Sequence, residues 1–295
     1  MNNVADLKRK PFSISDVHVM PQSPNMPLAI NKMKPIAPGR WIVRGSFHEG
    51  DKRFLEENRG RQATPVSLAA LAMTHVVDSS DWTSEDTLVR GDVLYQNTME
   101  HLEKMGISMD SPQSPEEGQE EEGEEVPVGT LAAADVLNRF KVSEYDCIET
   151  EVMDSAFTGM LSTLNPEGDS GLPPLKTVLW QFFKDHTHGV FTARGASTAI
   201  WKHKGFYYYF DPHGCDENGL PSSEPRATAC LVRIRGNVTD LADVMLNNLA
   251  PGSDDSFNIS PVAVTATKLN PEIGAPETKL EECVPYERLR YDTNQ

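Results

Sequence analysis

The sequence predicts an α+β protein in which helices come first and pack against one antiparallel sheet. Three observations lead to this fold class. Residues 65–77 and 83–106 are rich in helix-forming residues, residues 189–235 hold four short runs typical of strands, and glycines stand in the turns between those runs. Helices and strands that occupy separate parts of a chain are typical of the α+β class.

Two N-terminal helices have recognisable starts and ends. The run PVSLAALAMTHVV, residues 65–77, is strongly apolar, and its proline suits the first helical turn, where the missing N–H costs nothing. Thr83 precedes Asp86 by three residues, a capping pattern that opens the second helix, and Gly106 is the expected stop. Further helical segments are expected over 130–140, 150–164 and 238–249.

The strand pattern begins with WIVRGSF, residues 41–47. Later strands are expected over 189–194, 197–203, 205–211, 228–235 and 257–269. Pro261 within the last run predicts an edge position or an irregular start, because proline cannot donate to a strand ladder.

Composition excludes several classes of function. The 295 residues include 27 Lys and Arg against 44 Asp and Glu, a net charge of −17, which argues against nucleic acid or an anionic membrane as partner. The sequence contains no run of 18 apolar residues, so we expect no transmembrane helix. The four cysteines form no CxxC pair, so neither a zinc site nor a disulfide framework is indicated. We expect no metal and no cofactor. The N-terminus lacks the apolar region of a signal peptide, which favours a cytoplasmic location, with a nuclear one as the alternative.

The chain divides into one folded domain and three loose segments. Residues 1–38 are expected to be a disordered proline-rich arm, 39–269 the domain and 270–295 a flexible tail. An acidic disordered insertion interrupts the domain at about 107–129. Its glutamates contribute −7 to the net charge and stand at positions 116, 117, 120, 121, 122, 124 and 125.

Two regions carry candidate chemistry. Asp211 and His213 follow the strand at 205–211, and side chains two residues apart on a strand share a face. An Asp beside a His fixes the imidazole tautomer and stabilises its charged form, although such a pair alone is also compatible with a plain turn. The second region is the loop around Gly60, directly before the first helix. A thiolate at a helix N-terminus is stabilised by the helix dipole.

Several spaced motifs agree in order with one known family. They are Phe47, His48, Glu49, Gly50, Asp51, Phe54, Gly60, Arg61, Gln62, Ala63, Ser67 and Leu68, then Trp82, Gly91, Asp92, Leu94 and Tyr95, then Phe210, Asp211, Pro212 and His213. In these motifs, over about residues 41–265, the sequence resembles the herpesvirus tegument-type deubiquitinases and the related OTU-like cysteine peptidases. The resemblance implies a papain-like cysteine-protease fold, ubiquitin or a ubiquitin-like protein as partner, His213 as general base and Asp211 as the residue that orients it.

Two departures from that family decide the expected function. Ala63 stands where the family has its nucleophilic Cys, and Glu49 stands where it has the Gln thought to help form the oxyanion hole. Losing the nucleophile of a triad costs on the order of a million-fold in rate. A carboxylate also repels a developing oxyanion. The sequence therefore predicts a pseudo-deubiquitinase that binds protein without cutting it.

Three alternatives stay open. The chain is an active cysteine deubiquitinase if Ala63 replaces a native Cys. A rescue of catalysis by Thr64, Ser67 or Cys215 would need a different site geometry. A scaffold protein with a vestigial cleft is the last alternative, with the acidic insertion or the proline-rich arm as its binding segment.

Overall fold

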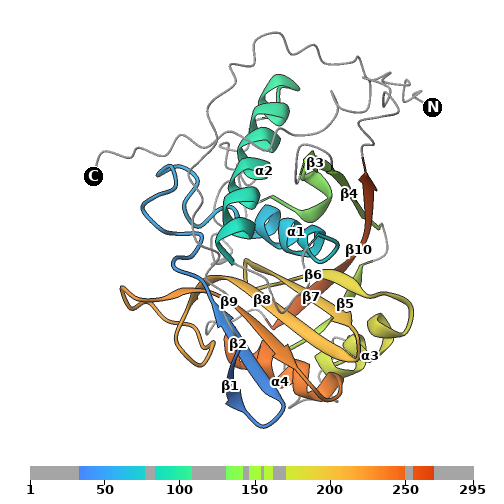
Figure 1. Ribbon diagram of the computed structural model, residues 1–295. Coiled ribbons are helices and arrows are strands. Elements are labelled where there is room, and N and C mark those ends of the chain that lie inside the picture. The colour runs from blue at the N-terminus through green and yellow to red at the C-terminus, as the bar shows by residue number, and fades with distance from the viewer. Residues whose placement is uncertain are drawn as a thin grey trace, which may run out of the picture.

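A computed structural model of the chain describes residues 33–76, 84–107, 131–141, 146–153, 156–161, 171–249 and 255–268 (Figure 1). Its strands are β1 (Lys34–Ala37), β2 (Arg40–Arg44), β3 (Arg139–Lys141), β4 (Asp146–Val152), β5 (Phe157–Met160), β6 (His188–Ala193), β7 (Ala196–His203), β8 (Phe206–Cys215), β9 (Thr228–Ile234) and β10 (Ser256–Lys268). The helices are α1 (Ala63–Met73), α2 (Ser84–Lys104), α3 (Leu175–Asp185) and α4 (Val238–Asn248), with a 3₁₀ turn at Ala133–Asp135.

The strands form one sheet in the order β1-β2-β9-β8-β7-β6-β10-β4-β3, and β5 pairs with β10 beside this path. All these pairs are antiparallel. The helices α1 and α2 lie on one side of the central strands, and α3 and α4 lie on the other (Figure 1). The expected α+β class with an antiparallel sheet is confirmed, but helices cover the sheet on two sides.

The aromatic strand β8 shows why both faces are covered. Tyr208 and Phe210 pack in the core beneath α1, whereas Tyr207 and Tyr209 pack in the core beneath α3 and α4. Side chains alternate across a strand, so a run of consecutive large apolar residues needs a core on each side. The run at 206–210 therefore belongs to a strand buried on both faces, not to one with a single buried face.

Helix α1 is the central helix of the molecule. Every one of its residues is buried, between the sheet on one side and α2 on the other. A helix that is apolar all round is typical of such a position. The approach of α2 is close at Gly91, where an added Cβ would stand 2.4 Å from the Cα of Val66. Glycine is therefore required at this contact.

The predicted turns agree with the structure. Gly195 and Gly205 have φ values of 72° and 79°, and the residues before them, Arg194 and Lys204, also have positive φ. Two successive positive φ values are typical of the tight hairpin turns that match strand twist. Gly106 ends α2 with φ of 77°, as expected for a left-handed residue after a helix.

Two predicted helices are wrong. Residues 131–141 hold only the 3₁₀ turn and strand β3, and the region 150–164 contains strands β4 and β5. Both β4 and β5 pair with β10, more than 90 residues later in the chain. Pairing with a strand so far away along the chain overrides the local helix propensity of these residues. Helix α3 was not expected, although Leu175, Val178, Leu179, Phe182 and Phe183 are buried at helical spacing.

Two further expectations about proline-containing segments need correction. Residues 34–37, placed within the disordered arm, form the edge strand β1 against β2. Pro261 lies neither at an edge nor at the start of its strand. It is the last residue of β10 that pairs with β6, and Val262 is the first that pairs with β4. Proline is tolerated there because the strand changes partner at that point.

Some expectations concern residues outside the described part of the chain. These are the arm up to residue 32, the motif residue Trp82, the cap at Thr83, nearly all of the acidic insertion and the tail at 270–295. Among the described helices, none is both long enough and apolar enough to cross a membrane.

Candidate functional site

The predicted pair Asp211 and His213 is assembled at the end of β8. The Oδ1 atom of Asp211 lies 2.7 Å from Nδ1 of His213 and also accepts the backbone N–H of His213 at 2.9 Å. Tyr209 donates its hydroxyl to the other carboxylate oxygen at 3.3 Å. The Asp211 carboxylate is buried and accepts hydrogen bonds on both oxygens, so it holds the imidazole ring in one orientation.

The loop that carries Glu49 reaches the same point from the other side. The backbone N–H of Glu49 donates to the carbonyl of Pro212 at 3.0 Å. The Glu49 side chain is only 3 % exposed, and its Oε1 lies 3.3 Å from Nε2 of His213. Both nitrogens of the His213 ring therefore face carboxylates, Asp211 on one side and Glu49 on the other.

Charge explains the protonation of this site. Burial disfavours the charged ring of His213, but the carboxylates of Glu49 and Asp211 outweigh it and raise the pKa of His213 to about 9. Burial also favours a raised pKa for Asp211, yet the charged ring holds the pKa of Asp211 below its usual value. At neutral pH we therefore assign His213 as imidazolium, donating from both ring nitrogens.

Glu49 is the member of the group whose negative charge is least well compensated. Burial raises the pKa of Glu49, and the positive charge of His213 opposes that rise. Its second carboxylate oxygen is buried without a hydrogen-bond partner. Glu49 therefore takes up a proton more readily than an exposed glutamate as the pH falls.

The start of α1 is joined to this group by one side chain. Gln62, the residue before the helix, donates its amide N–H to the carbonyl of Glu49 at 2.8 Å. Ala63 follows as the first helical residue and is 8 % exposed. No side chain caps the helix start. The structure thus brings Glu49, Asp211 and His213 into contact, and Gln62 links Glu49 to the helix start at Ala63.

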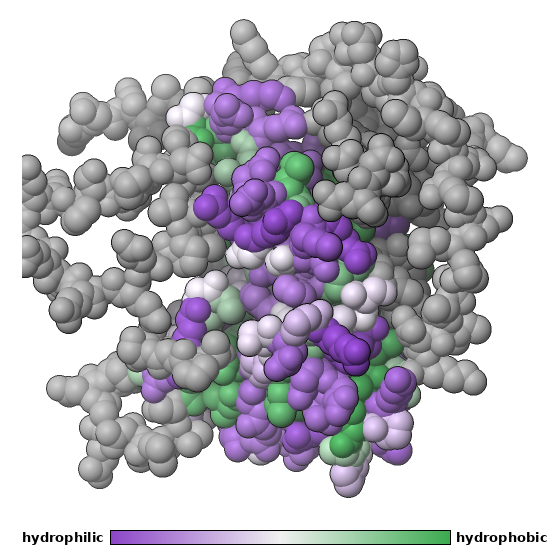
Figure 2. Space-filling view, turned by 90° about the vertical axis from the view of Figure 1, so that its left-hand side faces the viewer, coloured by the Kyte–Doolittle hydropathy of each residue, from purple (hydrophilic) through white to green (hydrophobic). Residues whose placement is uncertain are grey.

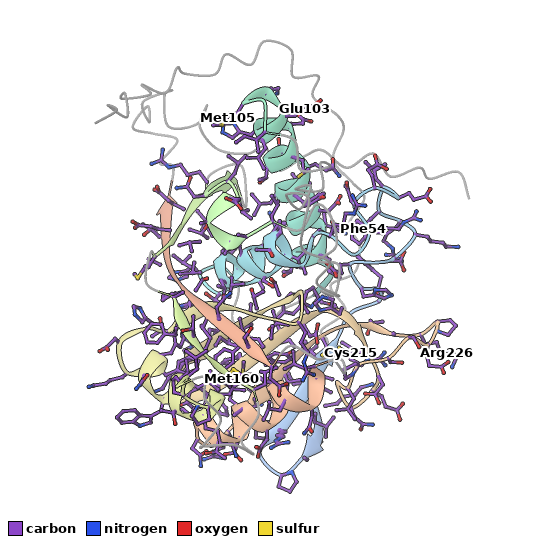
Figure 3. All side chains as sticks on the ribbon, turned by 180° about the vertical axis from the view of Figure 1, so that it is seen from behind. Phe54, Glu103, Met105, Met160, Cys215 and Arg226 are labelled. Carbon is purple, nitrogen blue, oxygen red and sulfur yellow. The ribbon has the colours of Figure 1, made fainter. Side chains whose placement is uncertain are left out.

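The candidate replacements for a nucleophile are all engaged or buried. Thr64 donates its hydroxyl to Ser197 at 2.9 Å, and Ser67 is fully buried. Cys215 is fully buried, and its thiol contacts the carbonyl of His213 at 3.6 Å (Figure 3). A hydrogen bond with Cys230 and burial raise the pKa of Cys215 well above its usual value, which is the opposite of an activated thiol.

Two residues that sequence reasoning missed support the site. Arg44, at the end of β2, donates to the carbonyls of Cys215 and Arg226 and to the hydroxyl of Thr228. It thereby joins the end of β8 to the residues that lead into β9, among them Arg226 (Figure 3). The other is Tyr209, which the two-residue period of β8 places on the same face as Asp211. No local signal marks Arg44.

Among the described residues, the side of the molecule that carries the 45–62 and 216–227 connections is mostly hydrophilic (Figure 2). Apolar side chains appear there in small groups, mainly in the lower half of the view.

Within the described residues, no three His, Cys, Asp or Glu side chains are placed to hold a metal ion.

The fold is shared with a viral protease. The chain is similar to the crystal structure of the ubiquitin-specific protease encoded by murine cytomegalovirus tegument protein M48, solved with a ubiquitin-based suicide substrate. The TM-score is 0.56 at 14 % identity, over 80 % of this chain and 90 % of that one. The described domain therefore has the fold of a viral deubiquitinase.

Residues 44–268 match the family described as herpesvirus tegument protein, N-terminal conserved region. This chain belongs to that family. No curated protein is similar enough in sequence to count as a match.

Proposed function

We propose that this domain is a pseudo-deubiquitinase, a papain-like, OTU-like protease fold that binds ubiquitin or a ubiquitin-like protein without cutting it. The observation that carries the proposal is the contact between the Glu49 carboxylate and Nε2 of His213. In a cysteine protease that nitrogen exchanges a proton with the nucleophile. Here a fixed anion takes that place, and the helix begins with Ala63.

The electrostatics of the site support a stable, non-catalytic arrangement. An active Cys–His pair is stabilised as thiolate and imidazolium, two opposite charges side by side. In this chain the imidazolium of His213 is already balanced by the carboxylate of Glu49. The ring therefore keeps its position and charge without a thiolate, and the scaffold around it is preserved for binding.

Binding is tested by titrating isotope-labelled ubiquitin with the full chain and following amide NMR shifts. We expect saturable shifts centred on the ubiquitin tail and its apolar patch, and weaker binding of ubiquitin that lacks the tail. The variant Trp180→Ala serves as a control and should bind ubiquitin as the unchanged chain does. Trp180 is 64 % exposed on α3, on the opposite side of the sheet from α1. The proposal is wrong if neither ubiquitin nor a ubiquitin-like protein shifts at millimolar concentration of the chain.

Catalysis is tested separately with a fluorogenic ubiquitin substrate. We expect no turnover by the chain as it stands. Turnover that is lost in His213→Ala would instead favour the alternative of an active enzyme, whose support is the intact Asp211–His213 pair. A cytoplasmic or nuclear location belongs to this proposal and is tested by fractionation of cells that express the chain.

A further inference from the structure

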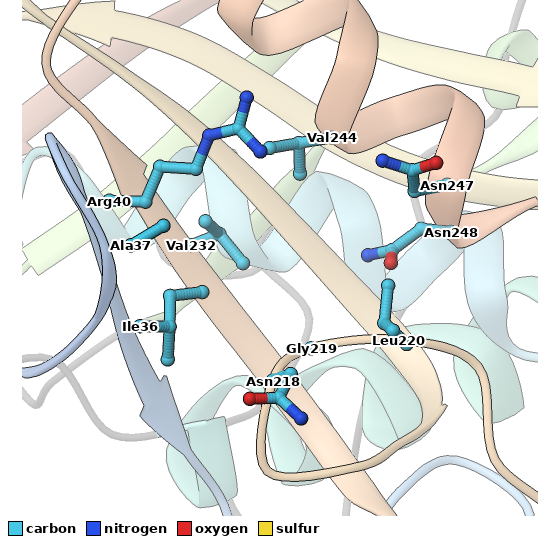
Figure 4. A pocket seen from close by; sticks show the side chains of 10 residues that line it. All are labelled: Ile36, Ala37, Arg40, Asn218, Gly219, Leu220, Val232, Val244, Asn247 and Asn248. Atoms are coloured by element: carbon cyan, nitrogen blue, oxygen red, sulfur yellow. The ribbon is translucent and has the colours of Figure 1, made fainter.

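A groove with a volume of about 140 Å³ lies on the α4 side of the sheet, away from the site described above (Figure 4). It is bounded by β1, the first residue of β2, β9, the C-terminal half of α4 and the turn at residues 216–220. None of Glu49, Ala63, Asp211 and His213 lines it.

The floor of the groove is apolar. Val232 of β9 and Val244 of α4 are buried beneath it, and Ile36 and Leu220 stand at its sides. Such a floor binds a short aliphatic group by removing it from water. The volume suits a group no larger than a small side chain.

Hydrogen-bond donors without partners face this apolar floor. Asn248 is only 7 % exposed, its amide nitrogen has no hydrogen-bond partner, and in Figure 4 that nitrogen points into the groove. Arg40 is half-buried, lines the same groove and has no ion-pair partner among the described residues. A buried donor without a partner is costly, so the site is matched to a ligand that accepts hydrogen bonds.

The wall opposite Arg40 is rigid. Asp216 accepts the backbone N–H groups of Asn218 and Leu220 on one carboxylate oxygen, at 2.8 and 2.9 Å. Gly219 has φ of 80°, and an added Cβ would meet Ile42 at 3.1 Å. The groove is therefore preformed, and the Asp216 carboxylate serves the turn instead of neutralising Arg40.

Charge selects the kind of ligand. The C-terminal end of α4 carries about half a negative charge, whereas the guanidinium of Arg40 carries a full positive one. The nearby carboxylate of Asp243 is paired with Lys176 at 3.3 Å. The groove therefore keeps a positive charge and also holds the donor of Asn248.

We propose that this groove binds a carboxylate carried on a short branched aliphatic chain. The carboxylate accepts hydrogen bonds from Arg40 and Asn248, and the aliphatic part rests on Val232 and Val244. This chemistry occurs in free small carboxylic acids and in the C-terminal residue of a peptide that ends in an aliphatic side chain.

The test uses NMR of the full chain and follows the side-chain amide signals of Asn248. The probes are isovalerate, N-acetyl-leucine and the uncharged N-acetyl-leucinamide. We expect saturable shifts with both carboxylates and none with the leucinamide. Comparable affinity for the two acids indicates a free acid, whereas binding of N-acetyl-leucine that is at least about tenfold tighter indicates a peptide terminus.

Two variants locate the binding. Arg40→Gln is expected to weaken the binding of the carboxylates at least about tenfold, because it removes a charge-assisted hydrogen bond. Arg235→Gln removes an exposed positive charge nearby without changing the lining, and should leave affinity unchanged. The proposal is overturned if Asn248 does not respond to either acid, if leucinamide binds equally well, or if Arg40→Gln retains full affinity in a spectrum that shows a folded protein.

Discussion

The charge of the His213 ring depends on the carboxylate of Glu49. The substitution Glu49→Gln removes the negative charge of residue 49 and keeps the shape of its side chain. The two atoms involved, Nε2 of His213 and Oε1 of Glu49, are 3.3 Å apart. At this distance Coulomb's law, 332/(ε × 3.3), gives about 1.3 kcal/mol for an effective dielectric constant ε of 80 and about 5 kcal/mol for 20. Since 1.36 kcal/mol corresponds to one pKa unit, the pKa of His213 should fall by about 1 to 4 from its value of about 9.

About a third of the His213 side chain faces solvent, which screens the interaction. We therefore expect a fall in the pKa of His213 toward the lower part of that range. The assay is NMR titration of the histidine ring signals, with His213 assigned by its loss in His213→Gln. Glu57→Gln is the matched control, because it removes the same charge from an exposed position in the loop before α1. An unchanged His213 pKa in Glu49→Gln would refute the assignment of Glu49 as its second counter-ion.

The same ion pair predicts how stability varies with pH. His213 has a folded pKa above its unfolded value, so its contribution is fully present below pH 6.5 and is lost as the pH rises through about 9. Glu49→Gln should reduce this loss between pH 6.5 and 9, measured as the free energy of unfolding in urea.

Three further predictions follow from packing and charge. In Ala63→Cys, the carboxylate of Glu49 is a negative charge near the new thiolate and disfavours it. The thiol pKa, measured by peptide-resolved alkylation, should therefore be lower in Ala63→Cys/Glu49→Gln than in Ala63→Cys alone. Equal values in the two variants would contradict this. Burial raises the pKa of Asp92 to about 6. The free energy of unfolding should therefore fall by up to about 3 kcal/mol as the pH rises from 4 to 6. Urea unfolding at several pH values should show that Asp92→Asn removes this dependence on pH. Gly91→Ala should lower the free energy of unfolding by about 1–3 kcal/mol, because the new methyl group meets the Val66 backbone; thermal unfolding at an unchanged temperature would argue against the tight helix contact.

The sequence by itself determined the features that depend on near neighbours. The turns at Gly195 and Gly205 follow from the positive φ that glycine tolerates, and the strands on either side follow from their apolar runs. The Asp211–His213 pair is also local, because two residues on one strand share a face and the hydrogen bond closes over two positions. The absence of a nucleophile at Ala63 is a property of the sequence alone.

The tertiary structure decided whatever depends on distant partners. Residues 146–152 and 157–160 are strands because β10 supplies their hydrogen bonds, and local propensity carries no information about such a distant partner. The contact of Glu49 with His213 joins residues 164 positions apart. From the sequence, Glu49 was a lost oxyanion donor. Only the fold turned it into the counter-ion of the histidine, because packing brought a buried carboxylate within ion-pair distance of the ring.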